Sequence, residues 1–214
     1  MGRRALRKVD PKLDLSRHWL DAEKLPPKFD AADLFGRQAP VEVEVGSGKG
    51  LFLTAACTSQ PDHDFIGIEL AKKYSHYAAS RLAKAVIPNG KMISGDALRV
   101  FREWIPDGSL AAVHVYFPDP WWKARHKKRR VLNEVFLGDV ERTLIVNGRL
   151  HFWTDVEEYY QTTLELIAAT VKLVGPLAVP ERTAEHDLDY RTHFERRTRK
   201  SDLPVYRAEF LKPD

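Results

Sequence analysis

Short apolar runs alternate with amphipathic stretches along most of the chain. Six runs have the length and the β-branched or aromatic content of strands: "VEVEV" at 41–45, "DFIGIEL" at 64–70, "KMISGD" at 91–96, "LAAVHVYF" at 110–117, "RLHFWTD" at 149–155 and "VYRAEFL" at 205–211. Between them lie stretches with helical spacing: residues 50–59, 71–86, 129–145 and 156–174. This alternation predicts an α/β fold, in which helices cover both faces of a mostly parallel sheet.

The helix expected after Arg130 has the clearest apolar stripe. Its apolar residues recur at three- and four-residue steps: Val131, Leu132, Val135, Phe136, Val140 and Leu144. Such spacing places side chains on one face of a helix. We expect this face to pack in the core and to carry no chemistry.

The first 38 residues lack this periodicity. They are rich in charge and proline, as in "KLPPKF", which predicts a basic N-terminal arm that lies on the domain or is partly disordered. Residues 39–214 are expected to form a single domain. The arm contains four cations that suit a polyanion, namely Arg3, Arg4, Arg7 and Lys8. A solvated tail is the alternative.

The composition fits one globular domain. With 214 residues, of which 43% are apolar and 30% charged, the chain can bury a core without disulfides or metals. The net charge of +4 indicates a nucleic-acid partner only if the cations are clustered. The single cysteine, Cys57, lies among apolar helix formers and predicts a buried thiol in a reducing compartment. No histidine stands at metal-ligand spacing, and no stretch has the roughly 18 apolar residues of a membrane span. We expect no metal, no membrane contact and a cytoplasmic location.

A glycine-rich turn follows the first strong strand. In "VEVEVGSGKG" the strand leads into Gly46, Gly48 and Gly50, which allow backbone to approach a nucleotide closely. The third glycine comes one residue too early for the dinucleotide-binding spacing G-x-G-x-x-G. The spacing therefore argues against a nicotinamide dinucleotide and an oxidoreductase, although it does not exclude them.

Acidic residues stand at the ends of three successive predicted strands. Glu44 precedes the glycines, Glu69 ends "FIGIEL" and Asp96 ends "ISGD". Ligands of such sheets bind at the carboxyl edge of the strands, and carboxylates there suit a sulfonium-bearing amino acid and the hydroxyls of a ribose. The alternative assigns Glu44 to an outward strand position, Glu69 to a helix N-terminus and Asp96 to a helix N-cap. Because all three fall at one edge, we expect a site for an adenosyl ligand.

A proline-flanked acid follows the strand at 110–117. In "FPDP" both Phe117 and Asp119 precede a proline, which disfavours the helical region for each of them. We expect an extended chain that presents Asp119 to a ligand. The alternative is that Asp119 only accepts hydrogen bonds from loop amides.

The next residues combine aromatic rings with cations. "WWKARHKKRR" contains six Lys and Arg within its last eight residues, beside Phe117, Trp121 and Trp122. Rings that stack on a base, next to cations that hold phosphates, are typical of sites that take a nucleotide out of a folded nucleic acid. A solvated charged face is the alternative. Guanine N7 would be a suitable target, because it offers a lone pair and no proton has to be removed, while a carboxylate holds the N1 and N2 hydrogens.

The stretch "YFPDPWWKARHKKRR" resembles the bacterial tRNA (guanine-N7-)-methyltransferase family, which belongs to the class I S-adenosylmethionine-dependent methyltransferases. The resemblance spans about residues 41–210. It implies a Rossmann-like fold with a seven-stranded, mostly parallel sheet, S-adenosyl-L-methionine as methyl donor, and methylation of a guanine in the variable loop of tRNA. Trp122 stands where some relatives carry His.

The resemblance also implies roles for individual residues. Asp119 would be catalytic, and the cofactor would be held by Glu44, Gly46, Gly48, Glu69, Asp96 and Asp119. Substrate contacts would come from Lys123, Asp155 and the T-x-F-E signature formed by Thr192, His193, Phe194 and Glu195. The RNA-contacting segment would comprise Arg125, His126, Lys127, Lys128, Arg129 and Arg130. A helix capping box is the alternative for Thr192 and Glu195, and an N-cap is the alternative for Asp155.

Two further alternatives stay open at this point. One is methylation of an exocyclic amine in RNA or DNA, against which the two prolines of "FPDP" argue. The other is a catalytically silent RNA-binding protein with the same fold. In the reading we favour, tRNA is the partner, DNA is not, and the chain is a monomer or a homodimer without an obligate protein partner.

Overall fold

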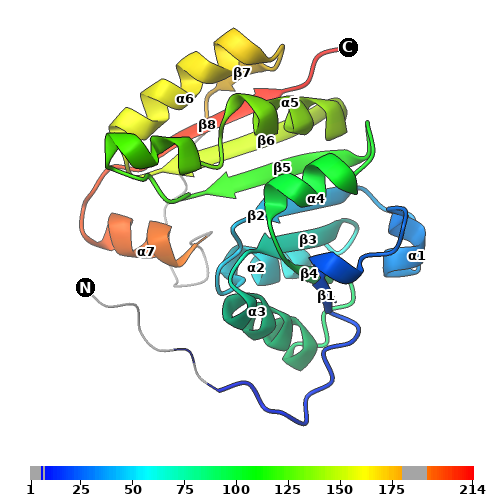
Figure 1. Cartoon of the computed structure of the whole chain (residues 1–214). Coiled ribbons are helices and arrows are strands. Elements are labelled where there is room, and N and C mark those ends of the chain that lie inside the picture. Colours follow the sequence, from blue (N-terminus) through cyan, green and yellow to red (C-terminus); the bar gives the residue numbers. More distant parts are fainter. Residues whose placement is uncertain (1–5, 7, 180–191) are drawn as a thin grey trace.

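An eight-stranded sheet forms the centre of the computed structural model, which describes residue 6, residues 8–179 and residues 192–214. Its strand order is β1-β4-β3-β2-β5-β6-β8-β7 (Figure 1). The strands are β1 (Trp19–Asp21), β2 (Val41–Val45), β3 (Asp64–Glu69), β4 (Gly90–Ser94), β5 (Leu110–Tyr116), β6 (Leu144–Thr154), β7 (Val174–Leu177) and β8 (Tyr206–Leu211). The helices are α1 (Ala31–Phe35), α2 (Leu51–Ser59), α3 (Lys72–Lys84), α4 (Ala97–Glu103), α5 (Glu134–Thr143), α6 (Glu157–Thr170) and α7 (His193–Lys200), with 3-10 helices η1 (Ala22–Lys24) and η2 (Ala124–Arg129).

The sheet is mostly parallel, as the sequence predicts. Strands β1 to β6 pair in parallel with their neighbours, and β8 is antiparallel to both β6 and β7. The number of strands differs from the seven expected. The extra strand, β1, comes from the segment assigned to the N-terminal arm and pairs with the edge of β4, where Trp19 lies opposite Met92. Three residues are too few to show a strand periodicity in the sequence.

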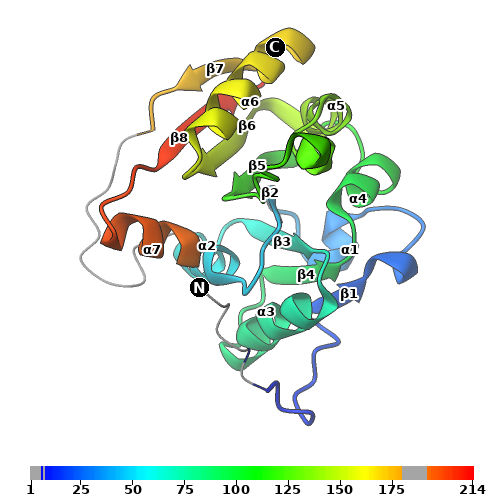
Figure 2. The ribbon, with the colours of Figure 1, turned by 60° about the vertical axis from the view of Figure 1, so that its left-hand side comes forward.

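The two faces of the sheet bury different clusters. Helices α4, α5 and α6 pack on one face, and α2 and α3 pack on the other (Figure 2). The central strand β2 is buried at all five positions. Its valines belong to the cluster under α4 to α6, so alternation along the strand directs Glu42 and Glu44 toward the α2 face. The glutamates of "VEVEV" are therefore interior residues.

The helix with the expected apolar stripe is shorter than the pattern suggests. Helix α5 begins at Glu134, because the side chain of Asn133 caps it by accepting a hydrogen bond from the Phe136 amide. Phe136 and Val140 are fully buried, as predicted. Val135 is 56% exposed, which corrects the expectation that it belongs to the core. Cys57 is buried as expected, and burial raises the pKa of its thiol.

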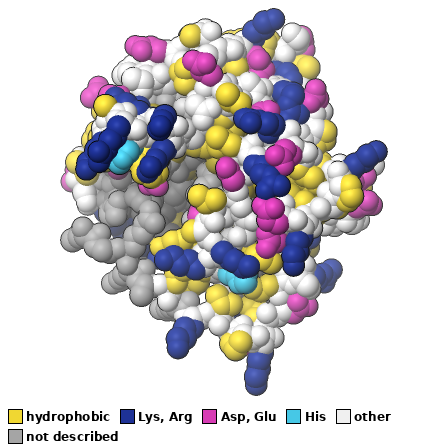
Figure 3. Space-filling model, in the orientation of Figure 1, with side chains coloured by type: hydrophobic (Ala, Val, Ile, Leu, Met, Phe, Trp, Pro, Cys, Tyr) yellow, Lys and Arg dark blue, Asp and Glu magenta, His cyan; other side chains and the backbone are white. Residues whose placement is uncertain are grey.

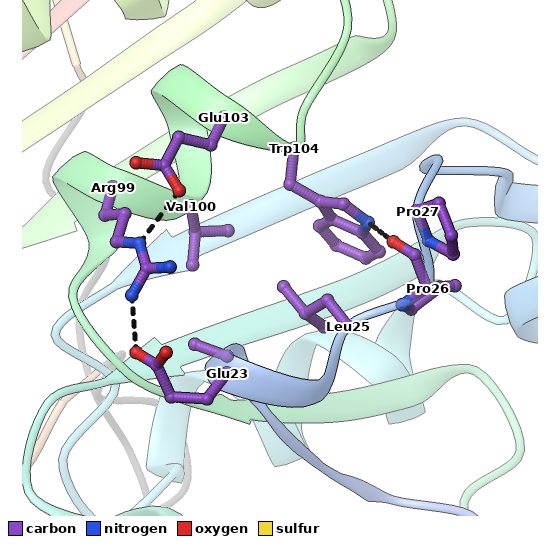
Figure 4. Close-up of a pocket in the computed structure, with 9 residues that line it drawn as sticks. Glu23, Leu25, Pro26, Pro27, Arg99, Val100, Glu103 and Trp104 are labelled. Carbon is purple, nitrogen blue, oxygen red and sulfur yellow. Dashed lines mark hydrogen bonds and ion pairs between the residues drawn. The ribbon is translucent and has the colours of Figure 1, made fainter.

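The described part of the N-terminal segment is packed against the sheet and α4. The Trp19 indole donates to Ser75 Oγ of α3 at 3.0 Å, and the Trp104 indole donates to the Pro26 carbonyl at 2.9 Å. A hollow of about 240 Å³ lies between this segment and α4 (Figure 4). The Arg99 side chain in this hollow is already paired with Glu23 and Glu103. We therefore interpret the hollow as a gap in the packing and not as a ligand site. Of the arm's candidate cations, Arg3, Arg4 and Arg7 lie outside the described residues, and Lys8 is exposed.

Two kinds of feature are absent from the described residues. No helix there is long and apolar enough to cross a membrane. No group of three or more His, Cys, Asp or Glu side chains in that part of the chain is arranged to hold a metal ion.

Candidate active site

The glycine turn between β2 and α2 has an open outer side. Gly46, Gly48 and Gly50 have φ values of 77°, 53° and 67°, which side chains rarely adopt. A Cβ atom built on Gly46 meets nothing within 4 Å, whereas one on Gly50 would lie 2.7 Å from the Cβ of Ala78. Gly50 thus allows α2 to pack on α3. Gly46 leaves room for a ligand at the edge of the sheet.

Glu69 joins the glycine turn to the next helix. Its Oε2 accepts a hydrogen bond from the Gly48 amide at 2.9 Å, and its Oε1 accepts one from the Ala71 amide at 2.8 Å, just before α3. Glu69 therefore does lie at a helix N-terminus, as the alternative states. Each carboxylate oxygen can accept a second hydrogen bond, so the same group remains suited to ribose hydroxyls.

Glu44 is the most unusual acid of the site. It is 4% exposed, and its Oε2 has no hydrogen-bond partner among the described residues. Burial, together with the negative charge of Glu69, raises the pKa of Glu44 to about 8. An unpaired buried oxygen is costly, and a cationic or N–H-bearing ligand would satisfy it. The alternative of an outward strand position is wrong for Glu44.

Asp96 completes the row of acids. The strand order β4-β3-β2 places the carboxyl ends of these strands side by side. Asp96, Glu69 and Glu44 therefore lie at the same edge of the sheet. Asp96 caps α4, because its Oδ1 accepts from the Leu98 amide at 3.0 Å. The N-cap alternative is thus confirmed. Asp96 is exposed, so the capping role does not prevent contact with a ligand.

The proline-flanked loop is more strained than the sequence predicts. Phe117 and Trp121, on either side of Asp119, have φ values of 50° and 48°, which are rare for bulky residues. The expected extended conformation is therefore wrong for Phe117. Phe117 is 9% exposed and belongs to the same buried cluster as Trp153, and its amide donates to the Trp153 carbonyl at 2.7 Å. This tertiary packing outweighs the local preference, and the loop leaves Asp119 exposed.

A hollow of about 370 Å³ lies beside Asp119. It is lined by Asp119, Pro120, Trp121, Trp122, Lys123 and His126. The Trp121 ring is partly buried: the Arg129 guanidinium lies 5.1 Å from its centre and the His126 ring meets it edge-on. Trp122 is 70% exposed. The hollow thus brings a carboxylate, a cation and an accessible indole to one place.

The basic segment does not present all its cations to solvent. Figure 3 shows Lys and Arg side chains gathered over η2. Lys123, Arg125, Lys128 and Arg129 are exposed. Lys127 is also exposed, but it pairs with Glu158 at 2.6 Å. Arg130 is only 8% exposed, which differs from the surface position expected of an RNA contact. Hydrogen bonds from Arg130 and Lys127 lower the pKa of Glu158 to about 2.

The remaining expected substrate residues follow β6 and begin α7. Asp155 is exposed, and α6 has Val156 as its N-cap, so the N-cap alternative is wrong for Asp155. Thr192 caps α7 by accepting from the Glu195 amide at 3.0 Å. Nothing is described of the side chains of His193 and Phe194.

Glu195, the residue whose amide donates to Thr192, is almost completely buried. It is 2% exposed and pairs with Arg199 of α7 and with Arg207 of β8. The Arg207 guanidinium lies 4.9 Å from the centre of the Trp153 ring. The Glu195–Arg207 pair thus connects α7 to β8, whereas the Glu195–Arg199 pair lies within α7. Because Thr192 caps α7, the capping alternative is correct for Thr192.

The sequence did not predict a buried network of hydrogen-bonded side chains that lies near the site. Glu42 contacts His63 Nδ1 and His114 Nε2, each at 2.6 Å, and His114 Nδ1 lies 2.9 Å from the Tyr116 hydroxyl. Burial alone would raise the pKa of Glu42, but the hydrogen bonds and charges of the two histidines outweigh it and lower the pKa. This hydrogen-bond network connects β2 to β5 just before the Asp119 loop. The glutamate at an inward position of "VEVEV" was the available signal.

Comparisons with known proteins agree with this geometry. A family model described as a putative methyltransferase matches residues 38–208. The tRNA (guanine-N(7)-)-methyltransferase of Rhodopirellula baltica is 50% identical, over 99% of this chain and 80% of the relative. The chain belongs to this family. Its member from Rubrobacter xylanophilus is 34% identical, over 90% of this chain and 85% of the relative.

Solved structures support the fold of the family. A 16S rRNA (adenine(1408)-N(1))-methyltransferase from Catenulisporales acidiphilia aligns with a TM-score of 0.56 and 17% identity, over 86% of this chain and 90% of that one. An S-adenosylmethionine-dependent methyltransferase from Aquifex aeolicus aligns with a TM-score of 0.55 and 14% identity, over 84% and 86% of the two chains. The Rossmann-like class I methyltransferase fold is therefore confirmed.

Proposed function

We propose that this chain transfers a methyl group from S-adenosyl-L-methionine to N7 of a guanine in the variable loop of tRNA. Membership of the family supports the reaction and the methyl donor. The observation that carries the assignment of the site is the placement of Asp119, which stands exposed on a strained loop at the same sheet edge as the acid-lined glycine turn. The product nucleoside is 7-methylguanosine.

The residues at the carboxyl ends of β2 to β4 fit the donor. S-Adenosyl-L-methionine carries an ammonium and a sulfonium group, and the buried, unpaired Oε2 of Glu44 suits such a cation. Glu69 is positioned to accept the ribose hydroxyls, and Asp96 stands beyond it on the adenine side. The open turn at Gly46 and Gly48 lets the ligand approach the backbone.

The chemistry at the acceptor requires orientation and no general base. When bound, S-adenosyl-L-methionine supplies the methyl group to the N7 lone pair by in-line displacement, leaving S-adenosyl-L-homocysteine and a positive charge on the guanine ring. Asp119 accepts hydrogen bonds from the N1 and N2 hydrogens of guanine and offsets the developing charge. Trp122 stacks on the base, and Lys123 holds it from the rim of the hollow.

The exposed cations of the loop bind the RNA backbone. Arg125, Lys128 and Arg129 are exposed residues of η2, and phosphates flanking the target nucleotide would lie near them. Asp155 and the start of α7 at Thr192 contribute further contacts to the substrate. A cytoplasmic location and a monomeric or homodimeric state remain predictions.

The test is transfer of labelled methyl groups to unmodified tRNA, followed by digestion to nucleosides. Label in 7-methylguanosine, lost in Asp119→Ala with tRNA binding retained, is the expected result. Label in N6-methyladenosine would contradict it and would support methylation of an exocyclic amine. Binding of tRNA without any transfer, whether or not Asp119 is replaced, would indicate a silent RNA-binding protein.

A further inference from the structure

Arg130 is the one residue of the basic segment, as described, whose guanidinium is enclosed. Its side chain is 9% exposed. Nε donates to the Pro120 carbonyl at 2.9 Å, Nη1 donates to Thr162 Oγ1 at 3.2 Å, and Nη2 donates to Glu158 Oε2 at 2.6 Å. The guanidinium also lies 4.3 Å from the centre of the Tyr159 ring. Each of the three guanidinium nitrogens therefore donates a hydrogen bond within the protein.

These contacts connect two loops of the site. Pro120 directly follows Asp119 in the loop after β5. The other three partners belong to the first half of α6, which begins two residues after Asp155 in the loop after β6. We propose that Arg130 is a positioning residue that locks the Asp119 loop against α6, and that it does not contact RNA. The proposal rests on the function proposed above.

The strain in the loop explains why such a lock is needed. Two bulky residues with positive φ flank Asp119, and a conformation of this kind is strained and persists only where the surroundings impose it. The Pro120 carbonyl lies between them in sequence, and Arg130 is the group that holds it. Loss of this bond would let the loop relax and move the Asp119 carboxylate away from the guanine.

Charge at this point also argues against an RNA contact. Arg130 and Lys127 share the carboxylate of Glu158, which is 44% exposed. Because Glu158 pairs with both cations, it offsets part of their attraction for a phosphate. Transfer of Arg130 to a phosphate would leave its contacts with Pro120 and Thr162 unmade. Among the described residues, the exposed neighbour Lys128 has no hydrogen bonds of this kind to give up.

The proposal separates Arg130 from Lys128 by two measurements on the full chain. These are the kcat and KM for tRNA at saturating S-adenosyl-L-methionine, and the salt dependence of tRNA affinity. Arg130→Lys, which keeps the charge but not the planar fork, is expected to lower kcat by about 10- to 100-fold because the reacting groups are misaligned. Its salt slope should equal that of the wild type. Lys128→Met is expected to raise the KM for tRNA and to reduce the slope by about 0.7–0.9.

Glu158→Gln is expected to change tRNA affinity and kcat differently. It removes a negative charge, so tRNA affinity should stay equal or increase, while kcat should fall as the lock on Arg130 loosens. Circular dichroism and S-adenosyl-L-methionine affinity check that each variant is folded, and Glu158→Gln keeps the test available if Arg130→Lys does not fold. An Arg130→Lys variant with reduced salt slope and normal kcat would overturn the proposal, as would an unchanged kcat in Glu158→Gln. Absence of methyl transfer by the wild type would instead overturn the proposed function.

Discussion

Glu44 is buried on the strand next to Glu69, and burial together with the charge of Glu69 raises the pKa of Glu44 to about 8. The folded protein therefore holds Glu44 mostly protonated at neutral pH, although a free carboxyl group ionises near pH 4.5. A ligand cation favours the ionised form and lowers this pKa again.

Binding of S-adenosyl-L-methionine should accordingly release a proton from Glu44. At pH 7 we expect a release approaching one proton, because the free site is protonated and the occupied one is not. Calorimetric titration in buffers with different ionisation enthalpies measures this number directly. Glu44→Gln is the matched control and should bind more weakly without proton release. Equal proton release by wild type and variant would contradict the assignment.

Replacement of Trp122 should weaken the reaction with tRNA. The indole is 70% exposed beside Asp119, and stacking on a base contributes about 1–3 kcal/mol, or roughly 5- to 150-fold. We expect Trp122→Ala to lower kcat/KM for tRNA in this range and Trp122→Phe to restore most of it. Val86→Ala, at another exposed apolar residue, should have no effect. A fully active Trp122→Ala variant would show that Trp122 does not stack on the base.

Two glycines of the same turn should respond differently to substitution. The methyl group of Gly46→Ala would contact no other atom. The variant should therefore lose only the free energy of unfolding that the left-handed backbone costs, about 1–2 kcal/mol. Its cofactor affinity should also fall. Gly50→Ala adds a collision with Ala78 to the same backbone cost. Urea unfolding should therefore rank Gly50→Ala as the less stable variant. Equal stabilities would contradict the packing described for α2 and α3.

Thr192 combines a structural role with an expected substrate contact. Thr192→Ala removes the cap of α7 and should cost about 0.5–2 kcal/mol in thermal unfolding. Thr192→Asp keeps an oxygen acceptor and should preserve stability. Its negative charge beside the RNA should still lower kcat/KM. Wild-type activity in Thr192→Asp would assign Thr192 to capping alone.

The sequence contained most of the fold because alternating strands and helices leave a strong pattern. It located the acids at the ends of β2, β3 and β4, since the ends of parallel strands must meet at one edge. It did not locate β1, whose three residues pair with β4, or β7 (Val174–Leu177), whose first residue was assigned to the preceding helical stretch. It also assigned an extended conformation to Phe117, which tertiary packing overrides. The local pattern of "KKRR" could not show that Arg130 faces inward, because its side-chain partners Glu158 and Thr162 lie 28 and 32 residues further along the chain.

The most direct measurement of the central claim is the position of the methyl group on the tRNA. Reduction with borohydride followed by aniline cleaves RNA at 7-methylguanosine, so the length of the fragments gives the position. With wild-type protein, S-adenosyl-L-methionine and unmodified tRNA, we predict a single cleavage at a guanine of the variable loop, absent when that guanine is replaced by adenine. Cleavage elsewhere, or no cleavage in a complete tRNA pool, would contradict the account.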